Sequence, residues 1–197
     1  MIVRILPAVL VAVLLQTAAA LAATNHGLRA IHALTAARHS DVDHVTSDEV
    51  AAKLSTAPEG VLILDVREAT EFQVSRIPGA RRVSPTMDAD TFRRRFGKDI
   101  DGRKVVLYCS VGVRSTELAS RIRSAALAAG ATSVANLTGG IFSWHNERRD
   151  LVNESGPTDR IHPYNTFWGT LIERDDLISY DANAQAAASG SEDTTNR

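Results

Sequence analysis

Short apolar runs alternate along the middle of the chain with segments whose apolar residues recur at helical spacing. Residues 61–64, 105–108 and 133–137 each have the length and composition of a buried strand. Residues 89–96 and 115–129 instead place apolar side chains three or four positions apart, as one face of a helix does. Alternating strands and helices predict an α/β protein whose open parallel sheet carries helices on both faces. Because no internal repeat is present, we expect a single domain.

Capping and composition signals divide the chain into segments. The segment Thr46–Glu49 matches a capping box, so we place the start of the domain there and its end near residue 149. Residues 23–45 are predicted to be a leader or linker. Residues 150–180 contain an apolar patch and are expected to pack back on the domain, whereas residues 181–197 have the composition of a disordered tail.

The first 22 residues have the three parts of a signal peptide. Arg4 supplies a positive charge, Ile5 to Leu15 form an apolar run, and Ala20-Leu21-Ala22 fits a cleavage site. We therefore expect an exported protein, periplasmic or secreted, with no membrane contact after cleavage. An uncleaved segment that anchors the protein in a membrane is the alternative.

The overall charge and the cysteine count restrict the classes of function. The net charge of −1 gives no reason to expect nucleic acid as a partner. The 197 residues include one cysteine, so an intramolecular disulfide cannot form, and the odd thiol is a candidate reactive group. Any sulfur chemistry at this cysteine must be completed by an external thiol or another acceptor.

Four histidines in the leader raise the question of a metal site. They lie six, seven and five residues apart, which does not place them as i, i+4 pairs on a helix, and no cysteine lies near them. We predict no metal and no cofactor. The histidines are His26, His32, His39 and His44.

The single cysteine, Cys109, directly follows the predicted strand at 105–108. Open α/β sheets bind ligands at this edge, and a loop that enters a helix presents backbone N–H groups that stabilise an anion such as a thiolate. A buried structural cysteine is the alternative. The predicted anion-binding loop consists of Ser110, Val111, Gly112, Val113, Arg114 and Ser115.

Three segments in order resemble the rhodanese family of sulfurtransferases. They are LILDVREATEFQVSRIPGA (residues 62–80), VVLYCSVGVRSTELASRI (residues 105–122) and NLTGGIFSWHNE (residues 136–147). The resemblance implies a rhodanese-like open parallel sheet. It also implies a two-step reaction, in which Cys109 takes sulfane sulfur from a donor such as thiosulfate and passes it to cyanide, a small thiol or a protein acceptor.

The spacing between Cys109 and Arg114 bears on the chemistry. Four residues separate them, whereas cysteine phosphatases have five at this point, so phosphate chemistry is disfavoured. We expect Arg114 to brace the loop by pairing with Asp65 or Glu71, with direct substrate contact as the alternative. Asp65 and Arg67 are expected to order the loop from the neighbouring strand end, and substrate binding is the alternative role for these residues as well. The loop itself lacks a cation to bind a dianionic donor.

Arg76 is one candidate to supply the missing charge, with a surface role as the alternative. Two other classes of function also remain open. One is a sulfane-sulfur carrier or redox-sensing module that does not turn over. The other is a catalytically inactive interaction domain, which is disfavoured because Cys109, Gly112 and Arg114 are all present.

Overall fold

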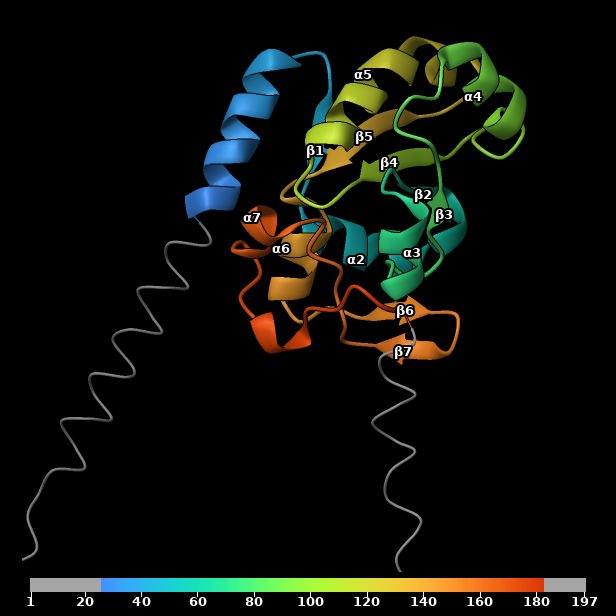
Figure 1. Cartoon of the computed structure of the whole chain (residues 1–197). Coiled ribbons are helices and arrows are strands. Elements are labelled where there is room, and N and C mark those ends of the chain that lie inside the picture. The colour runs from blue at the N-terminus through green and yellow to red at the C-terminus, as the bar shows by residue number, and fades with distance from the viewer. Residues whose placement is uncertain (1–25, 183–197) are drawn as a thin grey trace, which may run out of the picture.

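A computed structural model describes residues 26–182 and shows a five-stranded sheet between two layers of helices (Figure 1). All neighbouring strands in this sheet are parallel, in the order β1-β5-β4-β2-β3, so β4 lies in the middle. The predicted α/β fold with an open parallel sheet is confirmed. The strands are β1 (Asp43–Val45), β2 (Val61–Asp65), β3 (Arg81–Arg82), β4 (Lys104–Tyr108) and β5 (Ser133–Leu137).

Helices cover both faces of the sheet. Helix α5 packs against α4 on one face, while α2 and α6 lie on the other, and a helix over residues 26–38 stands beside β1 (Figure 1). The predicted capping box is present, because the Glu49 side chain accepts the N–H of Thr46 at 2.8 Å. The helices are α2 (Ser47–Thr56), α3 (Ala69–Val74), α4 (Ala89–Phe96), α5 (Val113–Ala128) and α6 (Gly140–Asn146), and a 3₁₀ turn covers Pro58–Gly60.

The central strands are buried on both faces, as a parallel sheet covered by helices requires. Along β4, Val106 and Tyr108 point into the core shared with α2 and α6, while Val105 and Leu107 point toward α4 and α5. Strand β2 alternates in the same way. This packing on both sides holds the carboxyl end of β4, where the cysteine follows, in a fixed position.

The sheet begins earlier in the chain than we predicted. Strand β1 pairs with β5 and lies in the segment 23–45 that we assigned to a leader, and Leu28 of the helix before it is buried in the core. The sheet therefore includes a strand ahead of Thr46, where we placed the start of the domain. The sequence does not mark this strand, because β1 has three residues and only Val45 is a buried apolar one.

Residues 150–180 pack on the domain through Leu151, Ile161 and Ile172. Part of the predicted apolar patch remains at the surface, since Phe167 is 74% exposed. The elements here are a hairpin of β6 (Leu151–Asn153) and β7 (Gly156–Thr158), helix α7 (Thr166–Gly169) and a 3₁₀ turn (Asp175–Leu177).

The predicted signal peptide and almost all of the predicted tail lie outside the described residues. Within residues 26–182, no helix combines the length and the apolar character that crossing a membrane requires.

Candidate active site

Cys109 lies at the carboxyl end of the central strand, where the chain turns into α5. The Gly112 N–H donates a hydrogen bond to its Sγ at 3.2 Å, and the side chain is 1% exposed. Gly112 has a left-handed backbone (φ 101°), and a Cβ there would come within 3.2 Å of the Asn136 amide nitrogen, so only glycine fits easily. Gly112 also caps α5 without a side chain, which leaves the helix N-terminus free to stabilise negative charge near the sulfur.

Helix α6 holds the first carbonyl groups of the loop. The Ile141 N–H donates to the Cys109 carbonyl at 2.9 Å and the Phe142 N–H to the Ser110 carbonyl at 3.0 Å. This approach requires Gly140, because a Cβ there would lie 2.4 Å from the Cys109 carbonyl oxygen. With these two carbonyls bound on the α6 side, the loop is held in the orientation that presents an amide to Sγ.

Glu71 of α3 is the acceptor that braces the loop. Arg114 donates to both of its carboxylate oxygens, at 3.0 and 2.9 Å, and the Ser110 hydroxyl donates to it at 2.9 Å. Burial opposes ionisation of Glu71, but the hydrogen bonds and charge of Arg114 outweigh it and lower the pKa of this carboxyl. Of the two partners that we considered for Arg114, the structure selects Glu71.

Asp65 and Arg67 form a separate ion pair beneath the loop. Both side chains are fully buried, the Arg67 guanidinium donates to Asp65 at 2.6 Å, and it also donates to the Ser75 carbonyl at 2.6 Å. The pair therefore holds the segment that carries Glu71, and it acts on the Cys109 loop through that residue. Burial would lower the pKa of Arg67, but the Asp65 carboxylate raises it above its ordinary value.

Arg76 makes its contacts with α3 and β6. Its guanidinium stacks on the Phe72 ring, 4.7 Å from the centroid, and its backbone pairs with Val152 of β6. No hydrogen bond or ion pair joins it to the loop within the described residues. The surface alternative agrees with this placement.

Two further residues of the predicted loop take structural roles. The Ser115 hydroxyl donates to the Asn136 amide oxygen at 2.7 Å, and Asn136 contacts the His44 ring at 3.3 Å. Val113 lies half-buried at the start of α5. Sequence reasoning missed Asn136 and His44, because a polar residue in a strand gives no signal until its neighbour in the sheet is known.

The C-terminal extension reaches the site, which the sequence did not indicate. The Tyr164 ring covers the Arg114 guanidinium at 4.7 Å, and Tyr164 has a left-handed backbone (φ 66°) whose N–H donates to His162 Nδ1 at 3.0 Å. His162 is 8% exposed. Burial lowers the pKa of His162. The nearby Glu71 charge opposes this effect, and the Arg67 and Arg114 charges act with it.

The leader histidines do not assemble with other ligands. His32 and His44 meet edge to face with ring centroids 4.7 Å apart. Among residues 26–182, no group of three or more His, Cys, Asp or Glu side chains is arranged to hold a metal ion.

The fold and the loop together define an α/β protein with a free, buried cysteine at the end of the central strand, where the chain turns into a helix. The model of the Rhodanese-like domain family matches residues 46–147, which is about half of the chain. The chain belongs to the rhodanese family.

Individual relatives are distant. The chain is 31% identical over 99 residues to the adenylyltransferase and sulfurtransferase MOCS3 of Drosophila yakuba. The aligned residues are 48% of this chain and 20% of that protein. The chain thus spans about a fifth of the length of this relative.

Solved structures that resemble the chain also have low sequence identity to it. Thiosulfate sulfurtransferase of Pseudomonas aeruginosa is 23% identical, with a TM-score of 0.49 over 74% of this chain and 26% of that chain. A rhodanese-like domain protein of Staphylococcus aureus is 26% identical, with a TM-score of 0.40 over 52% and 91% of the two chains.

Proposed function

We propose that this protein is a sulfurtransferase that carries sulfane sulfur on Cys109. The observation that carries the proposal is the hydrogen bond from the Gly112 N–H to Sγ, at the open N-terminus of α5. A backbone donor fixed at the sulfur stabilises the negative charge that develops there when sulfur is transferred. Membership of the rhodanese family and the sulfurtransferase named among the relatives support the same activity.

The reaction proceeds by two displacements at sulfur. The Cys109 thiolate attacks the outer sulfur of a donor such as thiosulfate, the donor S–S bond breaks, and sulfite leaves with the bonding electron pair. An acceptor thiolate or cyanide then attacks the terminal sulfur of the Cys109 persulfide and regenerates the thiolate. Since the chain has one cysteine, the acceptor comes from outside the protein.

The environment of Arg114 supports sulfur rather than phosphoryl chemistry. Both terminal nitrogens of its guanidinium donate to Glu71, and the Tyr164 ring covers its face. An arginine that binds a phosphate needs both terminal nitrogens of its guanidinium for the substrate oxygens. Here both nitrogens bind Glu71 and so brace the loop.

Intact-mass analysis after treatment with thiosulfate, and separately with an organic persulfide, tests the proposal. We expect a gain of about one sulfur atom, reversed by cyanide with release of thiocyanate. The Cys109→Ser variant should gain none. If no donor adds sulfur to the wild-type protein, the sulfurtransferase proposal is wrong.

Burial of Cys109 favours a second candidate, a carrier or redox sensor that does not turn over. A thiol that is 1% exposed is accessible to few acceptors, so its sulfur would wait for a specific partner. The same experiment separates the two candidates. A carrier gains one sulfur atom but shows no continued turnover with thiosulfate and cyanide.

We also propose that the protein acts after export, on the basis of its first 22 residues. N-terminal sequencing of the protein secreted or released from the periplasm tests this, with cleavage expected after Ala22. An intact N-terminus in a cytosolic fraction would contradict it.

A further inference from the structure

A buried polar side chain of the neighbouring strand lies against the loop that holds Cys109. Asn136 of β5 is 1% exposed, and its amide nitrogen lies 3.2 Å from the position that a Cβ of Gly112 would take. Its amide oxygen accepts the Ser115 hydroxyl at 2.7 Å. Gly112 caps α5 and donates its N–H to the Cys109 sulfur, while Ser115 lies in the first turn of that helix. Asn136 therefore ties the start of α5, and with it the amide at the sulfur, to the sheet.

The other hydrogen bond of the Asn136 amide joins it to His44 of β1. The two residues face each other across β1 and β5, and the Asn136 amide nitrogen lies 3.3 Å from His44 Nδ1. An amide NH2 group only donates, so Nδ1 is the acceptor, and the ring is neutral with its proton on Nε2. Nε2 is buried and has no hydrogen-bond partner among residues 26–182, so the ring gains no acceptor there when it becomes charged.

The surroundings of His44 favour the neutral ring. Burial lowers its pKa, the charge of His32 acts with burial, and the charge of Asp43 opposes them. His32 lies on the N-terminal helix and meets the His44 ring edge to face, with centroids 4.7 Å apart. Because the pKa of His44 lies below the ordinary value of about 6.5, this ring takes up a proton only in acid.

We propose that Asn136 is a positioning residue for Cys109, and that neutral His44 holds the Asn136 amide in the orientation that this requires. The inference rests on the proposed sulfur transfer and names a residue that positions its site. Protonation puts a hydrogen on Nδ1, so His44 no longer accepts from Asn136. The amide can offer its oxygen to the ring only by turning over, which takes that oxygen away from the Ser115 hydroxyl. Either result loosens the start of α5 and shifts the Gly112 amide relative to the sulfur.

Single-turnover loading of Cys109 across a range of pH tests the assignment, with thiosulfate and an organic persulfide as donors. His44→Asn keeps an acceptor near the position of Nδ1 but cannot titrate, so its rate should stay within about twofold of wild type above about pH 7. In acid, the wild-type rate should fall about three- to tenfold below that of this variant, because only wild type loses the acceptor. His39→Asn replaces a half-buried histidine that forms no side-chain hydrogen bond within residues 26–182, and should follow wild type.

Two further variants remove the contact at every pH. Asn136→Ala and His44→Leu should each slow loading about three- to thirtyfold near neutral pH. The ratio of their rates to the rate of His44→Asn should not change with pH, because neither variant couples a titrating ring to the loop. Urea denaturation at each pH verifies that the variants are folded.

The outcomes separate this inference from the proposed function. If wild type and His44→Asn depend on pH in the same way, or if Asn136→Ala loads Cys109 as fast as wild type, the positioning inference is wrong and sulfur transfer stands. If no donor loads Cys109, the sulfurtransferase proposal fails, and the rate of Cys109 alkylation by iodoacetamide then tests the same variants. A pH-dependent difference that follows His44 alone cannot arise from a general loss of structure.

Discussion

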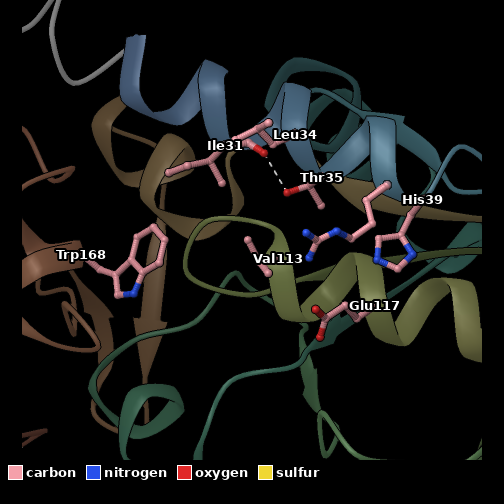
Figure 2. Close-up of a pocket in the computed structure, with 8 residues that line it drawn as sticks. Ile31, Leu34, Thr35, His39, Val113, Glu117 and Trp168 are labelled. Carbon is pink, nitrogen blue, oxygen red and sulfur yellow. Dashed lines mark hydrogen bonds between the residues drawn. The ribbon is translucent and has the colours of Figure 1, made fainter.

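The Cys109 loop and the groove formed by the N-terminal helix, α5 and α7 (Figure 2) share α5, but their charged residues are arranged differently. Around the loop, Glu71 and Arg114 are paired with each other, and so are the fully buried Asp65 and Arg67. In the groove, Arg38 and Glu117 are exposed and unpaired within residues 26–182. Paired charges fix a geometry, whereas free ones are available to a ligand. The paired charges therefore hold the backbone around Cys109, whereas the charges of the groove stay open to solvent.

We expect the largest effect on stability when the buried ion pair of Asp65 and Arg67 is broken. Asp65→Asn leaves the Arg67 guanidinium, which is 0% exposed, without its counter-charge, and should lower the free energy of unfolding by about 3 to 5 kcal/mol. Urea denaturation measures this. The control Asp90→Asn breaks an exposed pair with Arg93 and should cost under about 0.5 kcal/mol. Equal effects of the two substitutions would contradict the role given to the buried pair.

Weakening the ion pair of Glu71 and Arg114 should slow sulfur loading of Cys109 more than it lowers stability. Glu71→Gln removes the charge that holds Arg114 and Ser110, so the loop amides shift relative to Sγ. We expect the rate of Cys109 sulfur loading to fall roughly 10- to 100-fold, as misplacement near 1 Å does elsewhere. Single-turnover mass analysis measures it, with the exposed Glu59→Gln as control. An unchanged rate would show that the brace is dispensable.

The contact between the domain and its extension should respond to pH. His145 of α6 is buried against the Asp159 carbonyl at 2.9 Å, and burial together with the Arg174 charge lowers its pKa to about 4. In the unfolded chain its pKa is about 6.5, so below that value protons favour unfolding. The free energy of unfolding should therefore fall by roughly 2 to 3 kcal/mol between pH 6.5 and pH 4.

His145→Gln isolates this contribution, since burial also lowers the pKa values of the half-buried His44 and the buried His162, which act in the same direction. Denaturation curves of both proteins at several pH values should show a weaker acid dependence in the variant. Parallel curves would assign the effect to other groups.

Tyr164→Ala should give the smallest change. The ring stacks on Arg114 from the extension and is 45% exposed, so its removal loses about 0.5 to 1 kcal/mol of cation–π energy. We expect a two- to fivefold change in loading rate, measured beside Phe167→Ala, an aromatic residue of the same segment that is 74% exposed. A larger loss would give Tyr164 a direct part in the chemistry.

The elements with strong local signals were predictable from the sequence. The helix Ala89–Phe96 and the strand Ser133–Leu137 have the predicted bounds, because each carries an apolar pattern long enough to be read alone. The position of Cys109 after a buried strand followed from the same kind of signal. The pairing of Arg114 with Glu71 instead of Asp65 did not, since two carboxylates in one segment are equivalent until the backbone places them.

The parts that the sequence did not reveal depend on distant pairing. Strand β1 forms by pairing with the edge of β5. Tyr164 contacts Arg114 because the C-terminal extension folds back on the domain. The free charges of the groove were equally invisible, as Arg38 and Glu117 are ordinary surface residues in the sequence. Their significance comes from the helices that bring them to one groove.

The pairing of β1 with β5 also determines when the molecule is completed. His44 and Asn136, which meet across these strands, are 92 residues apart. Closing a loop of that length comes late, because its entropic cost precedes the contacts that compensate for it. A growing or refolding chain therefore has no edge for β1 until β5 has formed. The N-terminal helix follows β1 into place, so we expect the wall of the groove to assemble after the cysteine loop.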